Sequence, residues 1–287
     1  MRFQRLIFAA IIACAVSACA KDITGVTHTP PPLAYVRYVN AVADTFDMDF
    51  RAVDQVAYSP PYINVLFRGL GEGNYQGYQA GSRHIRIFLD PAPSSNLDAV
   101  DPAVVSTVMV DTTYTFTAGT YYTLLEVGSA RANTQKLVIL TDAFPAQTAG
   151  IQYRVFNLAT VQGAVDIYFT ADTFPPALGT PAVANVAPST TPSAYISQAT
   201  MASSVFAHMT VPGTATVVGL PHGYALQAGT AGTTDVDPIY GVTQPGSIFS
   251  IFVFDAAVAG SPAATPTNTT PAVVFYPDVQ PPRTTTP

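Results

Sequence analysis

Short apolar runs separated by turn-forming residues extend along most of the chain. The runs are rich in Val, Ile, Tyr and Phe, and Gly, Pro, Asn or Asp stands between them. Such runs predict β-strands, and their spacing is typical of a β-sandwich. In the first half we expect strands at 34–39, 46–51, 83–89, 104–110, 121–127 and 137–140. In the second half we expect them at 153–156, 165–169, 205–211, 215–218, 248–254 and 273–276.

The second half of the chain repeats the first. Residues 34–41 match 151–158, and 136–142 match 272–278. Three polar residues recur at the same spacing: Arg37, Asn40 and Asp49 in the first copy, and Arg154, Asn157 and Asp166 in the second. A chance similarity between two β-rich segments is the alternative. The repeat predicts an all-β fold of two tandem immunoglobulin-like or transthyretin-like β-sandwiches at 34–147 and 148–280, with a disordered tail at 281–287.

The N-terminus has the order of features of a bacterial lipoprotein signal peptide. Arg2 and Arg5 precede an apolar stretch at 6–16, which is shorter than the ~20 residues that a membrane-spanning helix needs. The segment 16–19, Val-Ser-Ala-Cys, resembles the lipobox, in which the peptide is cut before the cysteine that carries the lipid. We therefore expect a signal peptide at 1–18, lipid attachment at Cys19 and a Pro-rich tether at 19–33. An ordinary secretory signal is the alternative.

The expected lipid determines the expected location of the protein. Ala20, rather than Asp, follows the cysteine, and by similarity to lipoprotein sorting this predicts anchoring in the outer membrane, on its periplasmic or surface face. Cys14 lies inside the signal peptide, so the mature chain would have no cysteine for a disulfide or a metal site.

Composition narrows the classes of protein further. Only 10% of residues are charged, and the formal net charge is −6. An acidic chain lacks the basic surface of a nucleic-acid-binding protein, so we expect no nucleic-acid partner. Helix-favouring Glu and Lys are nearly absent, which agrees with a strand-rich fold.

Several short motifs resemble one bacterial family. These are Tyr-Val-Arg-Tyr-Val-Asn-Ala at 35–41, Val-Asp-Ile-Tyr at 165–168, and a Gly-Thr-Tyr strand followed by a strand that ends in Asp. They are similar to the start and end of the bacterial domain of unknown function 4397 (DUF4397). The resemblance implies a β-sandwich, extracytoplasmic placement and tandem domains, and it supplies no catalytic residue.

The recurring Arg and Asp residues suggest a structural pair in each copy. If the first two strands of a copy formed a hairpin, Arg37 would lie opposite Asp49, and Arg154 opposite Asp166. We therefore expect a cross-strand Arg–carboxylate pair in each copy, with a ligand site as the alternative. Asn40 and Asn157 would cap the turns between these strands, because Asn side chains bond locally to the backbone.

Other candidate chemistry in the sequence is weak. Asp44, Asp47 and Asp49 cluster, as do Asp235 and Asp237, but neither group forms a recognisable calcium loop, and calcium binding is left open. The His residues are scattered, and no Gly-x-Ser-x-Gly segment is present. We expect no metal, no cofactor and no enzyme activity.

Aromatic, Gly-rich segments are candidates for a binding surface. Tyr75 and Tyr78 lie in such a segment at 67–78, and a long Pro- and Ala-rich loop at 170–193 is a second candidate. The sequence favours the other interpretation, in which the Tyr side chains pack along strand faces.

The sequence thus predicts a lipid-anchored cell-envelope protein with a non-catalytic binding or scaffolding role. Its partner would be a glycan or an envelope protein. Two other functions stay open, an envelope hydrolase or carbohydrate-processing accessory protein and a purely structural spacer.

Overall fold

The computed structural model describes residues 30–54, 62–71, 74–90, 107–172, 177–219 and 224–283. The chain divides into two units, Met1–Pro31 and Pro32–Pro287, and the following description concerns the second. The predicted signal peptide, Cys19 and most of the predicted tether lie outside the described residues. Among those described, no helix is long and apolar enough to cross a membrane.

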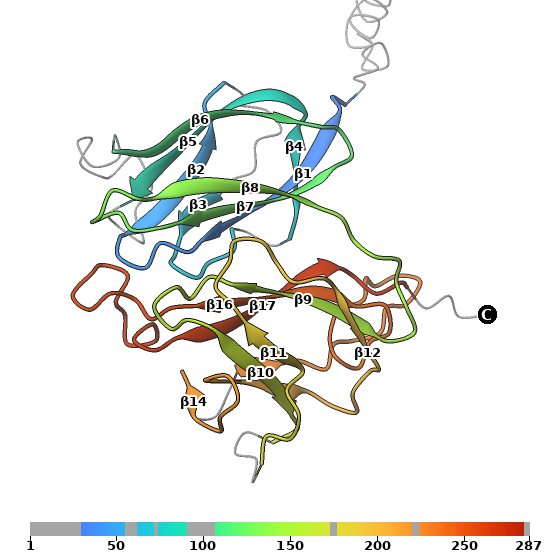
Figure 1. Cartoon of the computed structure of the whole chain (residues 1–287). Coiled ribbons are helices and arrows are strands. Elements are labelled where there is room, and N and C mark those ends of the chain that lie inside the picture. The colour runs from blue at the N-terminus through green and yellow to red at the C-terminus, as the bar shows by residue number, and fades with distance from the viewer. Residues whose placement is uncertain are drawn as a thin grey trace, which may run out of the picture. The chain divides into compact units, whose positions relative to one another are not determined.

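Eight strands of the first copy form a sandwich of two four-stranded sheets (Figure 1). One sheet has the order β4-β1-β7-β8, formed by β4 (Gln76–Gln79), β1 (Leu33–Asn40), β7 (Tyr121–Val127) and β8 (Lys136–Asp142). The other has the order β3-β2-β5-β6, formed by β3 (Tyr62–Val65), β2 (Asp47–Ala52), β5 (Gly81–Asp90) and β6 (Val108–Phe116). Strands β1 and β7 are parallel, and the other pairings are antiparallel.

The second copy repeats this topology. One sheet has the order β12-β9-β16-β17, formed by β12 (Ile196–Gln198), β9 (Ile151–Asn157), β16 (Ile248–Phe254) and β17 (Ala272–Val279). The other contains β11 (Val183–Val186), β10 (Val165–Thr170), β13 (Val205–Thr210), β14 (Val217–Val218) and β15 (Tyr224–Leu226). As β1 does with β7, β9 pairs with β16 in parallel. The predicted all-β fold with tandem β-sandwiches is confirmed.

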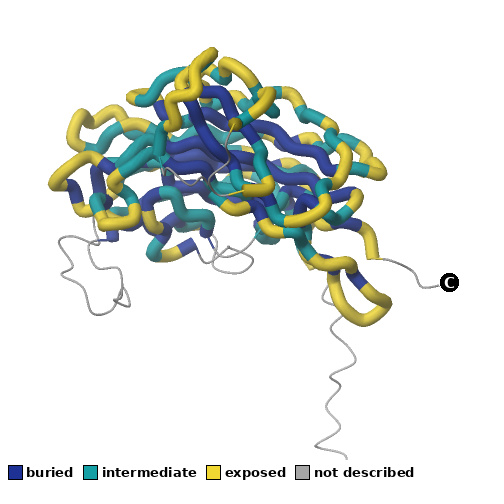
Figure 2. The backbone as a smooth tube through the Cα atoms, turned by 90° about the horizontal axis from the view of Figure 1, so that it is seen from below, coloured by how far each residue is buried: buried dark blue, intermediate teal, exposed yellow. Residues whose placement is uncertain are grey.

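Each sandwich has its own hydrophobic core, and a third core joins them. Strand β1 contributes to two of these cores, because its side chains alternate between its two faces. Val36 and Tyr38 pack in the core of the first sandwich, whereas Val39 packs with Phe156 and Phe252 of the second. Every residue of β9 and β16 is buried. The sheets that contain β1 and β9 are therefore covered on both faces, and the two sandwiches form one packed body. Figure 2 shows the buried segments in the middle of this unit and the exposed segments in its outer loops.

Candidate functional site

A network of buried polar side chains lies between the two sandwiches. Arg37 on β1 is fully buried. Its Nε donates to Thr123 Oγ1 at 2.8 Å, within the first sandwich. Its Nη1 donates to Asp278 Oδ1 at 2.7 Å, and its Nη2 to Ser250 Oγ at 3.1 Å, both in the second sandwich. The guanidinium thus has a neutral hydrogen-bond partner in its own sandwich, and a charged and a neutral partner in the other, so that the buried charge is compensated.

Arg154 on β9 makes the reciprocal set of contacts. Its Nε donates to Ser250 Oγ at 2.9 Å, and its Nη2 crosses to the first sandwich to donate to Asp142 Oδ1 at 2.6 Å. Both carboxylates also accept a hydrogen bond from a tyrosine hydroxyl. Tyr75 donates to Asp142 at 2.8 Å, and Tyr195 donates to Asp278 at 2.7 Å. Each copy therefore supplies a carboxylate to the arginine of the other copy, and Arg154 Nε also lies 3.5 Å from Asp278 Oδ2 of its own copy.

The predicted pairs Arg37–Asp49 and Arg154–Asp166 are wrong. They assumed that the first two strands of each copy form a hairpin, but β1 and β2 lie in opposite sheets, as do β9 and β10. Asp49 instead accepts hydrogen bonds from Asn64 N–H at 2.8 Å and from Arg51 at 3.0 Å.

Asp166 has the same role in the second copy as Asp49 in the first. It accepts a hydrogen bond from Asn185 N–H at 2.6 Å. Asn64 and Asn185 have φ values of 53° and 50°, a left-handed conformation that Asn tolerates better than most residues. The recurring Asp therefore holds a backbone irregularity in the strand next to it.

Asn40 and Asn157 make the local contacts expected of turn caps. Asn40 Oδ1 accepts a hydrogen bond from Val42 N–H, and Asn157 Oδ1 accepts one from Ala159 N–H, each at 3.0 Å. Both amide groups also donate to a carbonyl of the opposite sheet, that of Val65 at 2.9 Å for Asn40 and that of Val186 at 2.7 Å for Asn157. Each Asn thus fixes the loop after the first strand of its copy.

Tyr75 and Tyr78, the two candidate binding residues of the sequence, are packed inside the protein. Tyr78 is fully buried in the first core, where its ring packs against Phe50 and Phe116. The Cζ atom of Arg37 lies 4.7 Å from the centroid of the Tyr75 ring. The Tyr75 hydroxyl donates a hydrogen bond to Asp142. Both residues serve packing, the interpretation that the sequence favours.

The Asp residues that the sequence grouped have different surroundings. Asp47 lies opposite Asp90 in the pairing of β2 with β5. Burial, and then repulsion by Asp90 and Asp49, raises the pKa of Asp47 to about 6. Asp237 is exposed and pairs with Arg283. Within the described ranges, no group of three or more His, Cys, Asp or Glu side chains is placed to hold a metal ion.

A cleft of about 520 Å³ lies between loops of the two sandwiches. This volume is within the range of small-molecule sites. Its lining includes apolar side chains from both copies: Ala41, Phe67 and Val127 from the first, and Leu158, Phe254 and Val258 from the second. Phe67 and Phe254 contact each other edge to face, with centroids 6.1 Å apart. The cleft thus continues from the third core toward solvent.

Two aspartates fix the loops that form the rim of this cleft. Asp44, after β1, accepts hydrogen bonds from Ser129 Oγ at 2.5 Å and from Ala130 N–H at 2.9 Å. Burial alone would raise the pKa of Asp44, but these hydrogen bonds outweigh it and lower the pKa. Asp255, after β16, accepts hydrogen bonds from the N–H groups of Val161 at 2.9 Å and Gln162 at 2.8 Å.

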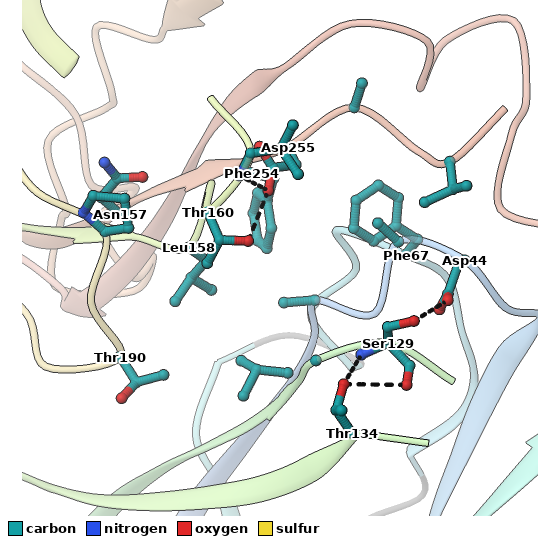
Figure 3. A pocket seen from close by; sticks show the side chains of 18 of the residues that line it. Asp44, Phe67, Ser129, Thr134, Asn157, Leu158, Thr160, Thr190, Phe254 and Asp255 are labelled. Carbon is teal, nitrogen blue, oxygen red and sulfur yellow. Dashed lines mark hydrogen bonds between the residues drawn. The ribbon is translucent and has the colours of Figure 1, made fainter. Parts of the chain in front are cut away.

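Figure 3 shows these contacts on opposite sides of the cleft, the Asp44–Ser129–Thr134 bonds on one side and the Thr160–Asp255 contact on the other. Both carboxylates are used to hold backbone groups. The arrangement therefore provides an apolar hollow whose two rim carboxylates are engaged by backbone amides and hydroxyl groups.

The sequence indicated only part of the cleft. Phe67 belongs to the first candidate binding segment, and Ser189 and Thr190 belong to the second, and all three line the cleft. Sequence reasoning missed Leu158 and Lys136, because they lie just outside the predicted strands at 153–156 and 137–140 and outside both candidate binding segments. The turn-capping contacts at Asn40 and Asn157 were the available signal, since they mark the loops that meet here.

Residues 34–168 match the family model of DUF4397, "Domain of unknown function (DUF4397)". The match supports the family that the sequence motifs resemble. It covers the whole first sandwich and then β9 and most of β10, so its end does not coincide with the boundary between the sandwiches. No curated protein is significantly similar to the chain.

Proposed function

We propose that the protein is a lipid-anchored component of the cell envelope that binds a ligand in the cleft between its two sandwiches and does no chemistry on it. The cleft carries this proposal. It is the place where loops of both copies meet, its lining is mostly apolar, and Asp44 and Asp255 hold its rim in a fixed shape. Loops on a rigid scaffold are where binding residues concentrate.

The state of the carboxylates favours binding over hydrolysis. A glycoside hydrolase needs two carboxyl groups that face the same bond, one of them free to give a proton. Asp44 and Asp255 accept backbone hydrogen bonds instead, and hydrogen bonding lowers the pKa of Asp44. A structural spacer would have no use for an open apolar hollow. These observations therefore favour binding over both alternatives.

The envelope location rests on the N-terminal motif and is tested at Cys19. In a bacterium with two membranes, the wild-type chain should take up a metabolic acyl label and fractionate with the outer membrane. Cys19→Ala should take up no label, because acylation needs the thiol. An unlabelled wild-type chain, or a Cys19→Ala chain that is labelled as strongly, would contradict the proposed anchor.

The binding role is tested with one substitution at the rim of the cleft. Val161 lines the cleft and is 89% exposed, so Val161→Glu should place a charge there without disturbing the core. Val236, 60% exposed and not part of the cleft lining, gives the matched control Val236→Glu. We expect at least one class in a panel of glycans, peptides and lipids to raise the melting temperature of the wild type and Val236→Glu, but not of Val161→Glu. A panel with no such class contradicts the proposal.

A further inference from the structure

The polar groups that line the cleft are almost all engaged inside the protein. Ser129 Oγ donates to Asp44, and Thr134 Oγ1 accepts a hydrogen bond from Ser129 N–H. Across the cleft, Thr160 Oγ1 donates to Asp255, and Ser189 Oγ accepts a hydrogen bond from Thr191 N–H. A ligand in the cleft therefore finds few polar partners and a largely apolar floor.

Lys136 is the exception. It begins β8, lines the cleft and is exposed. Within the described residues it is the only lysine, and no hydrogen bond or ion pair engages its ammonium group. The two carboxylates that line the cleft, Asp44 and Asp255, already accept hydrogen bonds from backbone amides and hydroxyls. The cleft thus offers one free cation at the edge of an apolar hollow.

We propose that the cleft binds the carboxylate of an acyl chain. The chain would lie over Phe67, Leu158 and Phe254, and its carboxylate would pair with Lys136. This assignment rests on the proposed binding function and names its ligand class. A peptide fits less well, because its backbone amides need partners along their whole length and the cleft supplies few. A sugar fits less well for the same reason, since its hydroxyl groups would lose water without replacement.

The volume and the exposed rim agree with this ligand. The cleft holds about 520 Å³, enough for a chain larger than a short organic acid. Val161 and Val258 on the rim are 89% and 42% exposed. Burial of such surface against a ligand is favourable by about 25 cal/mol per Å² of apolar area. A single ammonium group suits a carboxylate with one negative charge, whereas phosphate recognition usually employs several donors.

The test measures binding of a fluorescent acyl carboxylate, 11-(dansylamino)undecanoic acid, to the full chain, with dodecanoate and methyl dodecanoate as competitors. Dodecanoate should displace the probe more strongly than its uncharged ester. Lys136→Gln should weaken dodecanoate binding by about tenfold, as expected for loss of one partly desolvated ion pair, and should leave the ester unchanged. Lys136→Arg should retain most of the affinity.

Two rim variants separate this inference from the proposed function. Val161→Glu should weaken both competitors, and Val236→Glu should weaken neither. Equal dodecanoate affinities for the wild type and Lys136→Gln would overturn the assignment. If a glycan or peptide binds in a manner sensitive to Val161→Glu while dodecanoate does not, the acyl assignment fails and the binding function stands. If no compound is sensitive to Val161→Glu, both fail.

Discussion

Tyr38 and Glu126 form a polar pair inside the core of the first sandwich. Both are fully buried, and the Tyr38 hydroxyl donates to one oxygen of Glu126. The other oxygen, Oε1, has no hydrogen-bond partner. The second copy has Val155 and Val253 at the corresponding positions, one residue after Arg154 and three after Ser250. Tyr and Glu in one copy are therefore matched by two apolar residues in the other, as expected for two side chains that depend on each other.

The burial of Glu126 predicts that stability falls as pH rises. Burial raises its pKa from 4.5 to about 7, although the hydrogen bond from Tyr38 acts in the opposite direction. The folded state therefore binds the proton more tightly than the unfolded state. The resulting stability, on the order of 3 kcal/mol, is present below pH 4.5 and is lost as pH rises through 7. Urea unfolding should show a lower midpoint at pH 8 than at pH 5.

Glu126→Gln should flatten this dependence and raise the midpoint at pH 8, because Gln carries no charge to desolvate. Asp47, whose raised pKa of about 6 acts in the same direction, gives the comparison variant Asp47→Asn. That variant should flatten the profile mainly below pH 6, because the pKa of Asp47 in the folded chain is about 6 whereas that of Glu126 is about 7. A Glu126→Gln profile as steep as that of the wild type would show that Glu126 does not govern the pH dependence.

At the scale of single elements, the long central strands were predictable and the short strands were not. Runs of apolar residues at 121–127 and 248–254 coincide with β7 and β16. The sequence pattern missed β3, β4, β11, β12 and β15, which have only three or four residues each. A run that short has too few alternations to distinguish it from a loop, and pairing with a neighbour decides its conformation.

The pairing of the functional side chains could not be read from strand order alone. The repeat correctly indicated that Arg37 and Arg154 have equivalent roles, yet their partners come from the last strand of the opposite copy. The sequence did contain a signal, since the repeated segments 136–142 and 272–278 both end in Asp. What it lacked was the contact between the two inner sheets, which depends on the packing of whole sandwiches. The cleft could not be predicted from the sequence for the same reason, because its walls come from both sandwiches.

At the scale of the whole molecule, the reciprocal Arg–Asp pairs join the two sandwiches into one unit. Removing one partner of a buried pair leaves an uncompensated charge, which costs roughly 3–5 kcal/mol. Asp278 has no exposed side-chain surface, and it accepts hydrogen bonds from Arg37, Ser250 and Tyr195. The third core, which includes Val39, Phe156 and Phe252, lies in the same interface. Loss of Asp278 should therefore weaken both sandwiches together.

We expect the wild-type chain to unfold in one calorimetric transition and Asp278→Ala to lower its free energy of unfolding by roughly 3–5 kcal/mol. The matched control is Asp237→Ala, which removes the exposed ion pair with Arg283 and should cost less than about 1 kcal/mol. Asp142→Ala should resemble Asp278→Ala, because Asp142 accepts the reciprocal bond from Arg154 at 2.6 Å. Two separate transitions in the wild type, or an Asp278→Ala chain as stable as Asp237→Ala, would show that the sandwiches fold independently. A rigid cleft requires that the two sandwiches unfold together, because its two walls belong to different copies.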